Sequence, residues 1–230
     1  MPDTWVQALK SYSYPVDLRL YERGYGFPGF FNTLIKGDRY STIAFEGRFR
    51  EKGPNELGAF FEVIFWKLYS QEGRRQKGTN RILDFVKEKE VKAGQLWDAV
   101  QGFVECQSIR NLINIRKLLG IKSRVLAVPL TLPALASPET LPMIDNQVAK
   151  WVNINYRTYS ENMQNKLTPF KMNYTSLQQN DFDSYLSWIA WCRETAQILE
   201  DSTGKRWRPR DVEMAVFTAK RSKIDLDRSH

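Results

Sequence analysis

Apolar residues along most of this chain recur at intervals of three and four, which is the period of an amphipathic helix. The clearest run, from Leu57 to Leu68, includes Phe60, Phe61 and Ile64 and is apolar enough for a central core helix. The same spacing predicts further helices within residues 80–90, 93–104, 108–119, 123–128, 146–152, 183–199 and 209–219. About eight helices indicate an all-α or nearly all-α fold.

Residues typical of helix ends sharpen these boundaries. Side chains that can accept a hydrogen bond from a first helical turn precede four of the runs: Asn55, Ser108, Asp145, and Asp183 or Ser184. Pro209 suits the first position of the last helix, because a backbone N–H has no helical partner there. Gly120 suits the end of the helix within residues 108–119.

Three stretches interrupt the helical pattern. Among the first 55 residues, which are rich in Tyr, Phe and Gly, residues 41–50 alternate loosely and predict a strand of a short N-terminal β hairpin. Residues 73–78 indicate a basic loop bounded by glycines. The helix at 123–128 is expected to end at Pro129, where an apolar segment broken by prolines begins.

Length and composition favour one domain over residues 1–230, with room for two lobes. Apolar residues make up 42% of the chain, which is enough to bury a core. No window reaches the roughly 18 unbroken apolar residues of a membrane span. The first residues lack the basic and apolar regions of a secretory signal. We therefore expect a cytoplasmic protein without membrane contact.

The scarcity of cysteine and histidine excludes several kinds of site. Cys106 and Cys192 are too few for a four-cysteine metal or iron–sulfur site, and we expect two buried thiols. The only histidine is His230, which argues against Ser-His-Asp catalysis and against histidine-bound metals. Any chemistry must rest on carboxylates, lysines, arginines, hydroxyls or aromatics, and we expect no metal and no cofactor.

The charge of +8 fits a polyanionic partner such as nucleic acid, and its distribution says more than its total. Residues 106–138 contain five basic residues and no acidic one. Residues 205–230 contain eight basic residues against four acidic ones. On the helix within 108–119, Arg110, Asn114 and Lys117 share one side, opposite the apolar residues.

Two segments within residues 119–151 form a recognisable combination. A basic helix ends in Leu119-Gly-Ile-Lys122, and the later segment Pro142-Met-Ile-Asp-Asn-Gln-Val148 delivers Asp145 to a helix start. The combination resembles the helix-hairpin-helix DNA glycosylase superfamily, which includes endonuclease III-like and 8-oxoguanine glycosylase-like enzymes. That family carries a Leu-Pro-Gly-Val-Gly-x-Lys hairpin, an apolar helix and then Pro-Val-Asp-Thr-His-Val. This chain has one hairpin glycine instead of two, and Asn146-Gln147 in place of Thr-His.

The resemblance implies a bilobed helical fold with a cleft between the lobes, one lobe spanning about residues 55–140 and the other residues 1–54 plus 141–230. It also implies a monomer that binds double-stranded DNA, flips a damaged base out of the duplex and removes it. In this interpretation the carboxylate of Asp145 activates the nucleophile or stabilises positive charge on the sugar.

The resemblance further implies a lyase role for Lys122, whose neutral amine would attack the sugar C1′ and form a Schiff base. Burial and the neighbouring Arg124 would favour the neutral amine. The residues expected to contact DNA around the hairpin are Arg110, Lys117, Gly120, Ser123 and Arg124.

Plainer interpretations stay open for each of these residues. Asp145 has the sequence position of an ordinary N-cap, and a lysine after a helix-ending glycine is usually solvated. The basic cluster of residues 206–210 can grip phosphates or simply lead into a capped helix. Tyr185, Trp188 and Trp191 are expected in the core, with Trp191 the one candidate for base stacking. The alternative functions are a non-catalytic nucleic-acid-binding or scaffold domain and a protein-interaction domain.

Overall fold

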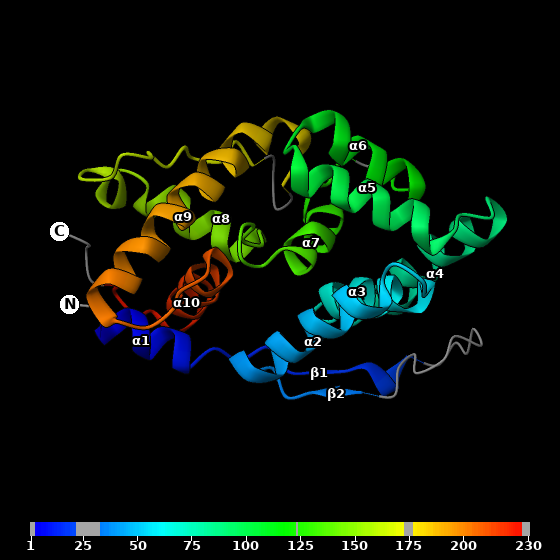
Figure 1. Cartoon of the computed structure of the whole chain (residues 1–230), viewed down its shortest axis with the longest axis horizontal. Helices are drawn as coiled ribbons and strands as arrows, with labels where there is room; N and C mark the ends of the chain where they lie inside the picture. Colours follow the sequence, from blue (N-terminus) through cyan, green and yellow to red (C-terminus); the bar gives the residue numbers. More distant parts are fainter. Residues whose placement is uncertain (1–2, 22–32, 123, 173–176, 227–230) are drawn as a thin grey trace. The chain divides into compact units, whose positions relative to one another are not determined.

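The computed structural model describes residues 3–21, 33–122, 124–172 and 177–226. In these ranges it contains ten α-helices, three short 3-10 helices (η) and one two-stranded ladder, so the all-α prediction is confirmed (Figure 1). No helix within the same ranges has both the length and the apolar character needed to cross a membrane.

The elements follow in the order α1 Asp3–Lys10, β1 Val16–Asp17, η1 Leu18–Leu20, β2 Leu34–Ile35, α2 Arg39–Lys52, α3 Leu57–Leu68, α4 Arg75–Glu88, α5 Ala93–Glu105, α6 Ile109–Leu118, α7 Ala127–Ala136, α8 Asn146–Asn155, η2 Thr158–Ser160, η3 Gln179–Asp181, α9 Phe182–Thr203 and α10 Pro209–Ser222.

The chain divides into two compact units. Unit 1 comprises residues 1–13, 125–127 and 137–230, and unit 2 comprises residues 14–124 and 128–136. Residues 14–54 therefore belong with the hairpin half of the chain, whereas the sequence prediction grouped them with the C-terminal half.

Unit 2 is organised around α3. Every residue from Gly58 to Trp66 is buried, and α3 packs against α2 and α4. Edge-to-face ring pairs join it to its neighbours: Phe49 lies 5.3 Å from Phe60, and Tyr21 lies 5.0 Å from Phe65. A helix that is apolar on all sides is stable only when it is surrounded, so the prediction of a central core helix here is confirmed.

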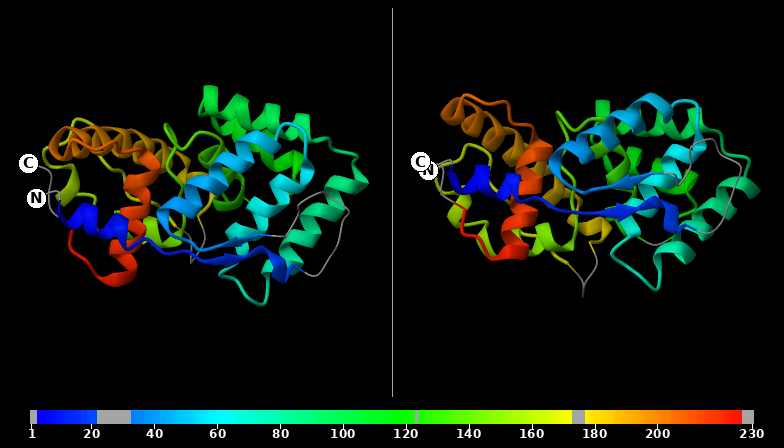
Figure 2. Two further views of the ribbon diagram at one scale, coloured as in Figure 1. Left: turned by 60° about the horizontal axis from the view of Figure 1, so that its bottom comes forward. Right: turned by 90° about the horizontal axis from the view of Figure 1, so that it is seen from below.

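The predicted strand at residues 41–50 is wrong, because these residues lie in α2. The buried positions are Thr42, Phe45, Glu46 and Phe49, and their spacing of three and four is helical. The strands that do form are β1 and β2, which pair antiparallel with Val16 opposite Ile35 and lie side by side next to α2 (Figure 2).

Two further predictions of secondary structure are wrong. The basic loop expected at residues 73–78 is largely helical, because α4 begins at Arg75. The helix expected to end at Pro129 instead begins at Ala127 and continues through Pro133 to Ala136. Pro129 lies in the first turn of α7, where an N–H has no helical partner, and α7 is buried from Pro129 to Leu135, so packing offsets the bond that Pro133 removes.

Unit 1 is organised around α10, which packs against α1, α8 and α9 (Figure 1). Every residue from Pro209 to Ala219 is buried, although this segment contains Arg210, Asp211 and Glu213. Pro209 is the first residue of α10, as predicted.

The predicted helix ends have mixed outcomes. Ser108 and Asp145 cap α6 and α8 through their side chains, and these predictions are confirmed. Asn55 does not cap α3, because Glu56 occupies the N-cap position and its side chain makes no capping hydrogen bond. The N-cap of α9 is Asp181 rather than Asp183 or Ser184. Of the two thiols expected to be buried, Cys192 is buried, but Cys106 is exposed.

Candidate functional site

Asp145 stands at the start of α8 in unit 1. Its Oδ1 accepts hydrogen bonds from the backbone N–H groups of Gln147, at 2.8 Å, and Val148, at 2.9 Å. Asp145 is partly exposed, and among the described residues no group donates to its Oδ2. The side chain therefore fills the N-cap role with one oxygen and leaves the other open to a ligand or a water molecule.

The extended segment before Asp145 is held by two buried side chains of α9. The Tyr185 hydroxyl donates to the carbonyl of Pro142 and the Trp188 Nε1–H donates to the carbonyl of Met143, both at 3.1 Å. Tyr185 and Trp188 are three residues apart, so they lie on one side of α9. Buried carbonyls outside regular structure need such donors, and these two fix the backbone that leads to Asp145.

Burial keeps Tyr185 in its donor form. Desolvation raises the pKa of its hydroxyl well above the ordinary range, the neighbouring Cys192 raises it further, and Arg193 lowers it slightly. The hydroxyl therefore stays protonated at neutral pH and can donate to Pro142.

Residues in the first turn of α10 and just before it hold residues 138 and 139, which precede this extended segment. The Arg210 backbone N–H donates to the carbonyl of Pro138 at 3.4 Å, and Arg206 forms an ion pair with Glu139 at 2.7 Å. From α9, the Arg193 Nε–H donates to the carbonyl of Thr140 at 2.9 Å. The segment of residues 137–145 is thus attached at several points before the chain enters α8.

Two buried ion pairs underlie this attachment, and the sequence interpretation missed them. Arg208 and Asp211 form a pair at 2.9 Å, and Arg210 forms a pair with Glu213. All four side chains are almost entirely buried, so neither the phosphate-gripping nor the solvated-loop interpretation fits Arg208 and Arg210. The signal in the sequence was the spacing of three between each arginine and its acid.

The hairpin segment, residues 119–122 in unit 2, is a compact helix end. The Ile121 N–H donates a hydrogen bond to the carbonyl of Arg116 at 2.9 Å, and the Gly120 N–H donates to the carbonyl of Lys117 at 3.1 Å. This pair of hydrogen bonds is a Schellman motif. Gly120 has a φ of +63°, and a Cβ there would lie 2.3 Å from the ring of Phe85. Only glycine satisfies both the left-handed turn and this close approach, so Gly120 is the predicted helix stop.

The basic residues expected to contact DNA are exposed in unit 2. Arg110, Lys117, Lys122 and Arg124 all reach solvent, and Asn114 is exposed on the same side of α6. Ser123 lies outside the described residues. Lys122 is not buried, so the burial that a Schiff-base role calls for is not seen at this amine.

Arg116 is the exception among these cations. It is buried, and desolvation lowers the pKa of its guanidinium, with a smaller lowering from Arg124. Arg116 therefore stabilises the turn, because its carbonyl accepts a hydrogen bond there and its side chain is packed in the interior. It is not part of the solvent-facing basic surface.

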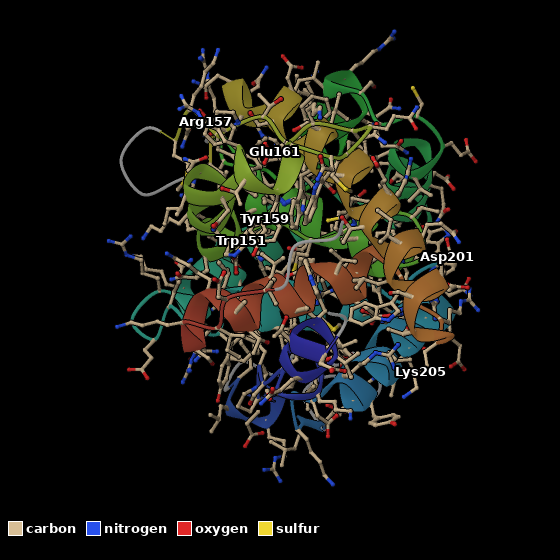
Figure 3. The ribbon with its side chains drawn as sticks, turned by 90° about the vertical axis from the view of Figure 1, so that its left-hand side faces the viewer. Trp151, Arg157, Tyr159, Glu161, Asp201 and Lys205 are labelled. Carbon is tan, nitrogen blue, oxygen red and sulfur yellow. The ribbon has the colours of Figure 1, made fainter. Side chains whose placement is uncertain are left out.

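The aromatic residues of α9 belong to the core. Trp191 is fully buried, stacks on Trp188 with ring centroids 5.4 Å apart and donates its Nε1–H to the carbonyl of Tyr159 at 2.9 Å. Figure 3 shows Trp151 beside Tyr159, and their rings are 4.8 Å apart. The alternative of Trp191 as a base-stacking platform is therefore wrong, because no face of its ring reaches solvent.

These observations define what the residues can do chemically. Asp145 offers a fixed carboxylate in unit 1 whose Oδ2 accepts no hydrogen bond from the described residues, and the hairpin offers exposed cations in unit 2. Within the described ranges no group of three histidine, cysteine or carboxylate side chains is placed to hold a metal ion. Comparisons with protein-family models, with curated proteins and with solved structures found no match for this chain.

Proposed function

We propose that this chain is a DNA-binding base-excision protein that cleaves the N-glycosidic bond of a damaged nucleotide. The observation that carries the proposal is the Asp145 carboxylate, which is held at a helix start with Oδ2 accepting no hydrogen bond from the described residues. The order of a basic helix, a glycine turn, an apolar helix and this aspartate supports it, as does the charge of +8.

The chemistry follows from the position of the charge. As the bond between the base and the sugar C1′ breaks, its electron pair leaves with the base and positive charge develops on the sugar. A fixed carboxylate stabilises that charge without having to reorganise. A water oxygen then bonds to C1′, and Oδ2 of Asp145 takes the proton that the water releases.

Rigid placement is what makes one carboxylate sufficient. Tyr185 and Trp188 hold the backbone at Pro142 and Met143, and the backbone N–H groups of α8 hold Oδ1. A reacting group that is held before the substrate arrives avoids the entropic cost of being positioned in the transition state. The buried hydrogen bonds around Asp145 are thus part of the proposed mechanism.

The test is release of free base from DNA duplexes that carry oxidised, deaminated or alkylated bases. We expect release from at least one class of lesion, and loss of that release in Asp145→Asn. A folded protein that releases no base from any duplex would remove the enzymatic proposal.

A lyase step by Lys122 is a separate part of the proposal. Borohydride reduction traps a Schiff base as a stable covalent adduct between protein and DNA. Trapping that is lost in Lys122→Gln would support the lyase role. Base release without trapping would assign Lys122 to DNA binding alone, which is the role that its exposure favours.

The main alternative is a nucleic-acid-binding domain without catalysis. It is favoured by the two hydrogen bonds that already give Asp145 a structural role as an N-cap. It predicts salt-sensitive DNA binding that is the same in the wild type and in Asp145→Asn, with no base released by either.

A further inference from the structure

A hollow of about 740 Å³ lies within unit 2, between α4 and the hairpin. Its walls include four charged residues of α4, namely Lys77, Arg81, Asp84 and Glu88, and Gly120 and Lys122 of the hairpin. We call it the α4–hairpin groove. No pattern in the sequence connects α4 with the hairpin, and the start of α4 was predicted to be a loop.

The charged side chains of the groove are exposed, and the cations outnumber the acids. Neither Lys77 nor Arg81 forms an ion pair with another described residue. Glu88 is close enough to Lys89 and Lys122 that both cations lower the pKa of its carboxyl, Lys89 more strongly. The groove therefore offers cations to a polyanion and also contains carboxylates that would repel it.

The two walls of the groove are held together by a close contact. The ring of Phe85 on α4 lies where a Cβ of residue 120 would be, so glycine allows the hairpin to approach the helix directly. Phe85 also lines the groove. The distance between the cations of α4 and those of the hairpin is therefore set by packing.

We propose that the α4–hairpin groove binds the phosphate backbone of duplex DNA, with Lys77 and Arg81 contributing contacts that lie outside the hairpin segment. This inference rests on the proposed function, since it takes DNA as the ligand. Charge complementarity supports this inference: two exposed cations that form no ion pair with a described residue lie in a hollow beside the hairpin lysine, on a chain of charge +8.

Because the groove contains both cations and carboxylates, substitutions in it should change the DNA affinity in opposite directions. If the backbone runs through the groove, Lys77→Gln and Arg81→Gln each remove a phosphate contact, and Glu88→Gln removes a repulsion. We expect the first two to weaken binding of a fluorescein-labelled undamaged duplex by roughly threefold to tenfold, and to reduce the salt slope by about one. We expect Glu88→Gln to strengthen binding by roughly threefold.

Matched controls come from unit 1, where Asp201 near the end of α9 and Lys205 just after it lie on the surface (Figure 3). Lys205→Gln and Asp201→Asn make the same changes in net charge as the groove variants. We expect both to leave the affinity within about twofold of the wild type, because a change in total charge acts weakly compared with a lost contact.

The outcomes separate this inference from the proposed function. Groove variants that behave like their controls would overturn the inference, as would tighter binding of a duplex RNA of the same sequence. If Asp145→Asn abolishes base release while the groove variants bind DNA normally, the proposed base excision is supported and DNA binding by the groove is excluded. If the groove variants change affinity as expected but no lesion is cleaved, the groove stands and the glycosylase proposal fails.

Discussion

The segment that carries Asp145 and the segment that forms the hairpin are built in different ways. Residues 137–145 have no regular structure. Buried side chains of α9 donate to the carbonyls of Pro142 and Met143, and the Arg210 backbone N–H of α10 donates to the carbonyl of Pro138. The hairpin is a regular helix end, held by its own backbone and by the contact between Gly120 and Phe85. The first arrangement fixes one carboxylate, and the second presents several exposed cations.

The contrast corresponds to the demands of two different tasks. A group that acts on a reacting bond must be held to within a fraction of an ångström, which calls for surrounding hydrogen bonds. Cations that bind phosphates act over longer distances and tolerate motion. Under the proposed function, the rigid segment suits catalysis by Asp145 and the exposed cations suit phosphate binding by the hairpin.

The largest effect on stability is expected at Gly120. Gly120→Ala would place a left-handed φ on alanine and press its Cβ against the Phe85 ring, and we expect a loss of about 2–4 kcal/mol in the free energy of unfolding. Urea denaturation measures this loss.

Gly204→Ala is the matched control for the hairpin. Gly204 has nearly the same φ, +62°, but its added Cβ would meet no atom within 4 Å. We expect Gly204→Ala to lose about 1–2 kcal/mol in the free energy of unfolding, from backbone strain alone. Equal losses in the two variants would contradict the role of Phe85 in holding the hairpin.

A smaller effect on stability, with a clear effect on activity, is expected at Tyr185. Tyr185→Phe leaves the buried carbonyl of Pro142 without its donor and should cost about 1–2 kcal/mol in the free energy of unfolding. Because the backbone before Asp145 loses an attachment, we also expect single-turnover base release to slow by roughly tenfold.

The control for Tyr185 removes a comparable hydrogen bond elsewhere in unit 1. The hydroxyl of the buried Tyr159 donates to the carbonyl of Leu226, away from the Asp145 segment. Tyr159→Phe should lower stability to a similar extent while base release continues at the wild-type rate. A parallel loss of rate in both variants would show that Tyr185 acts through overall stability and has no positioning role.

The smallest effect is expected at Glu194, a carboxylate whose two oxygens are both occupied. They accept three hydrogen bonds from Gln164 and Asn165. Burial alone would raise the pKa of Glu194, but these hydrogen bonds outweigh it and hold the pKa below the ordinary 4.5. Glu194→Gln should cost at most about 1 kcal/mol at neutral pH and leave base release unchanged.

The pH dependence at Glu194 follows from the direction of the shift. A carboxyl whose pKa is lower in the folded than in the unfolded protein stabilises the fold above the unfolded value, and this contribution fades as the pH falls through the folded value. The stability difference between the wild type and Glu194→Gln should therefore be largest near pH 7 and shrink below about pH 4.5. A difference that does not change with pH would contradict this assignment.

The sequence predicts the helices well where the hydrophobic residues follow one period. It predicts them poorly where a second pattern, such as alternation or a proline, points to a different structure. The run from Leu57 to Leu68 is apolar throughout, and it is α3. Residues 41–50 mix polar and apolar residues, so a loose alternation concealed the helical spacing of Thr42, Phe45 and Phe49. Pro133 is a strong local signal against a helix, but burial of α7 overrides it, and burial is a property of the whole fold.

The candidate site is predictable only in its local part. The N-cap role of Asp145 and the glycine turn at Gly120 follow from neighbouring residues, and both are confirmed. The hydrogen bonds from Tyr185 and Trp188 join residues that are 43 and 45 positions apart in the sequence. No local pattern can predict contacts over such separations. The burial of Arg210 is likewise set by the helices packed around α10.

The proposed mechanism requires that one oxygen of Asp145 caps α8 while the other acts on the sugar. Single-turnover base release and the thermal midpoint, measured together in Asp145→Asn, test it most directly, because asparagine is an equally good N-cap but carries no charge. We predict that release falls by at least about 100-fold, while the midpoint stays within about 3 °C of the wild type. Unchanged release in Asp145→Asn would contradict the claim, and so would a loss of release that only matches the fraction of unfolded protein.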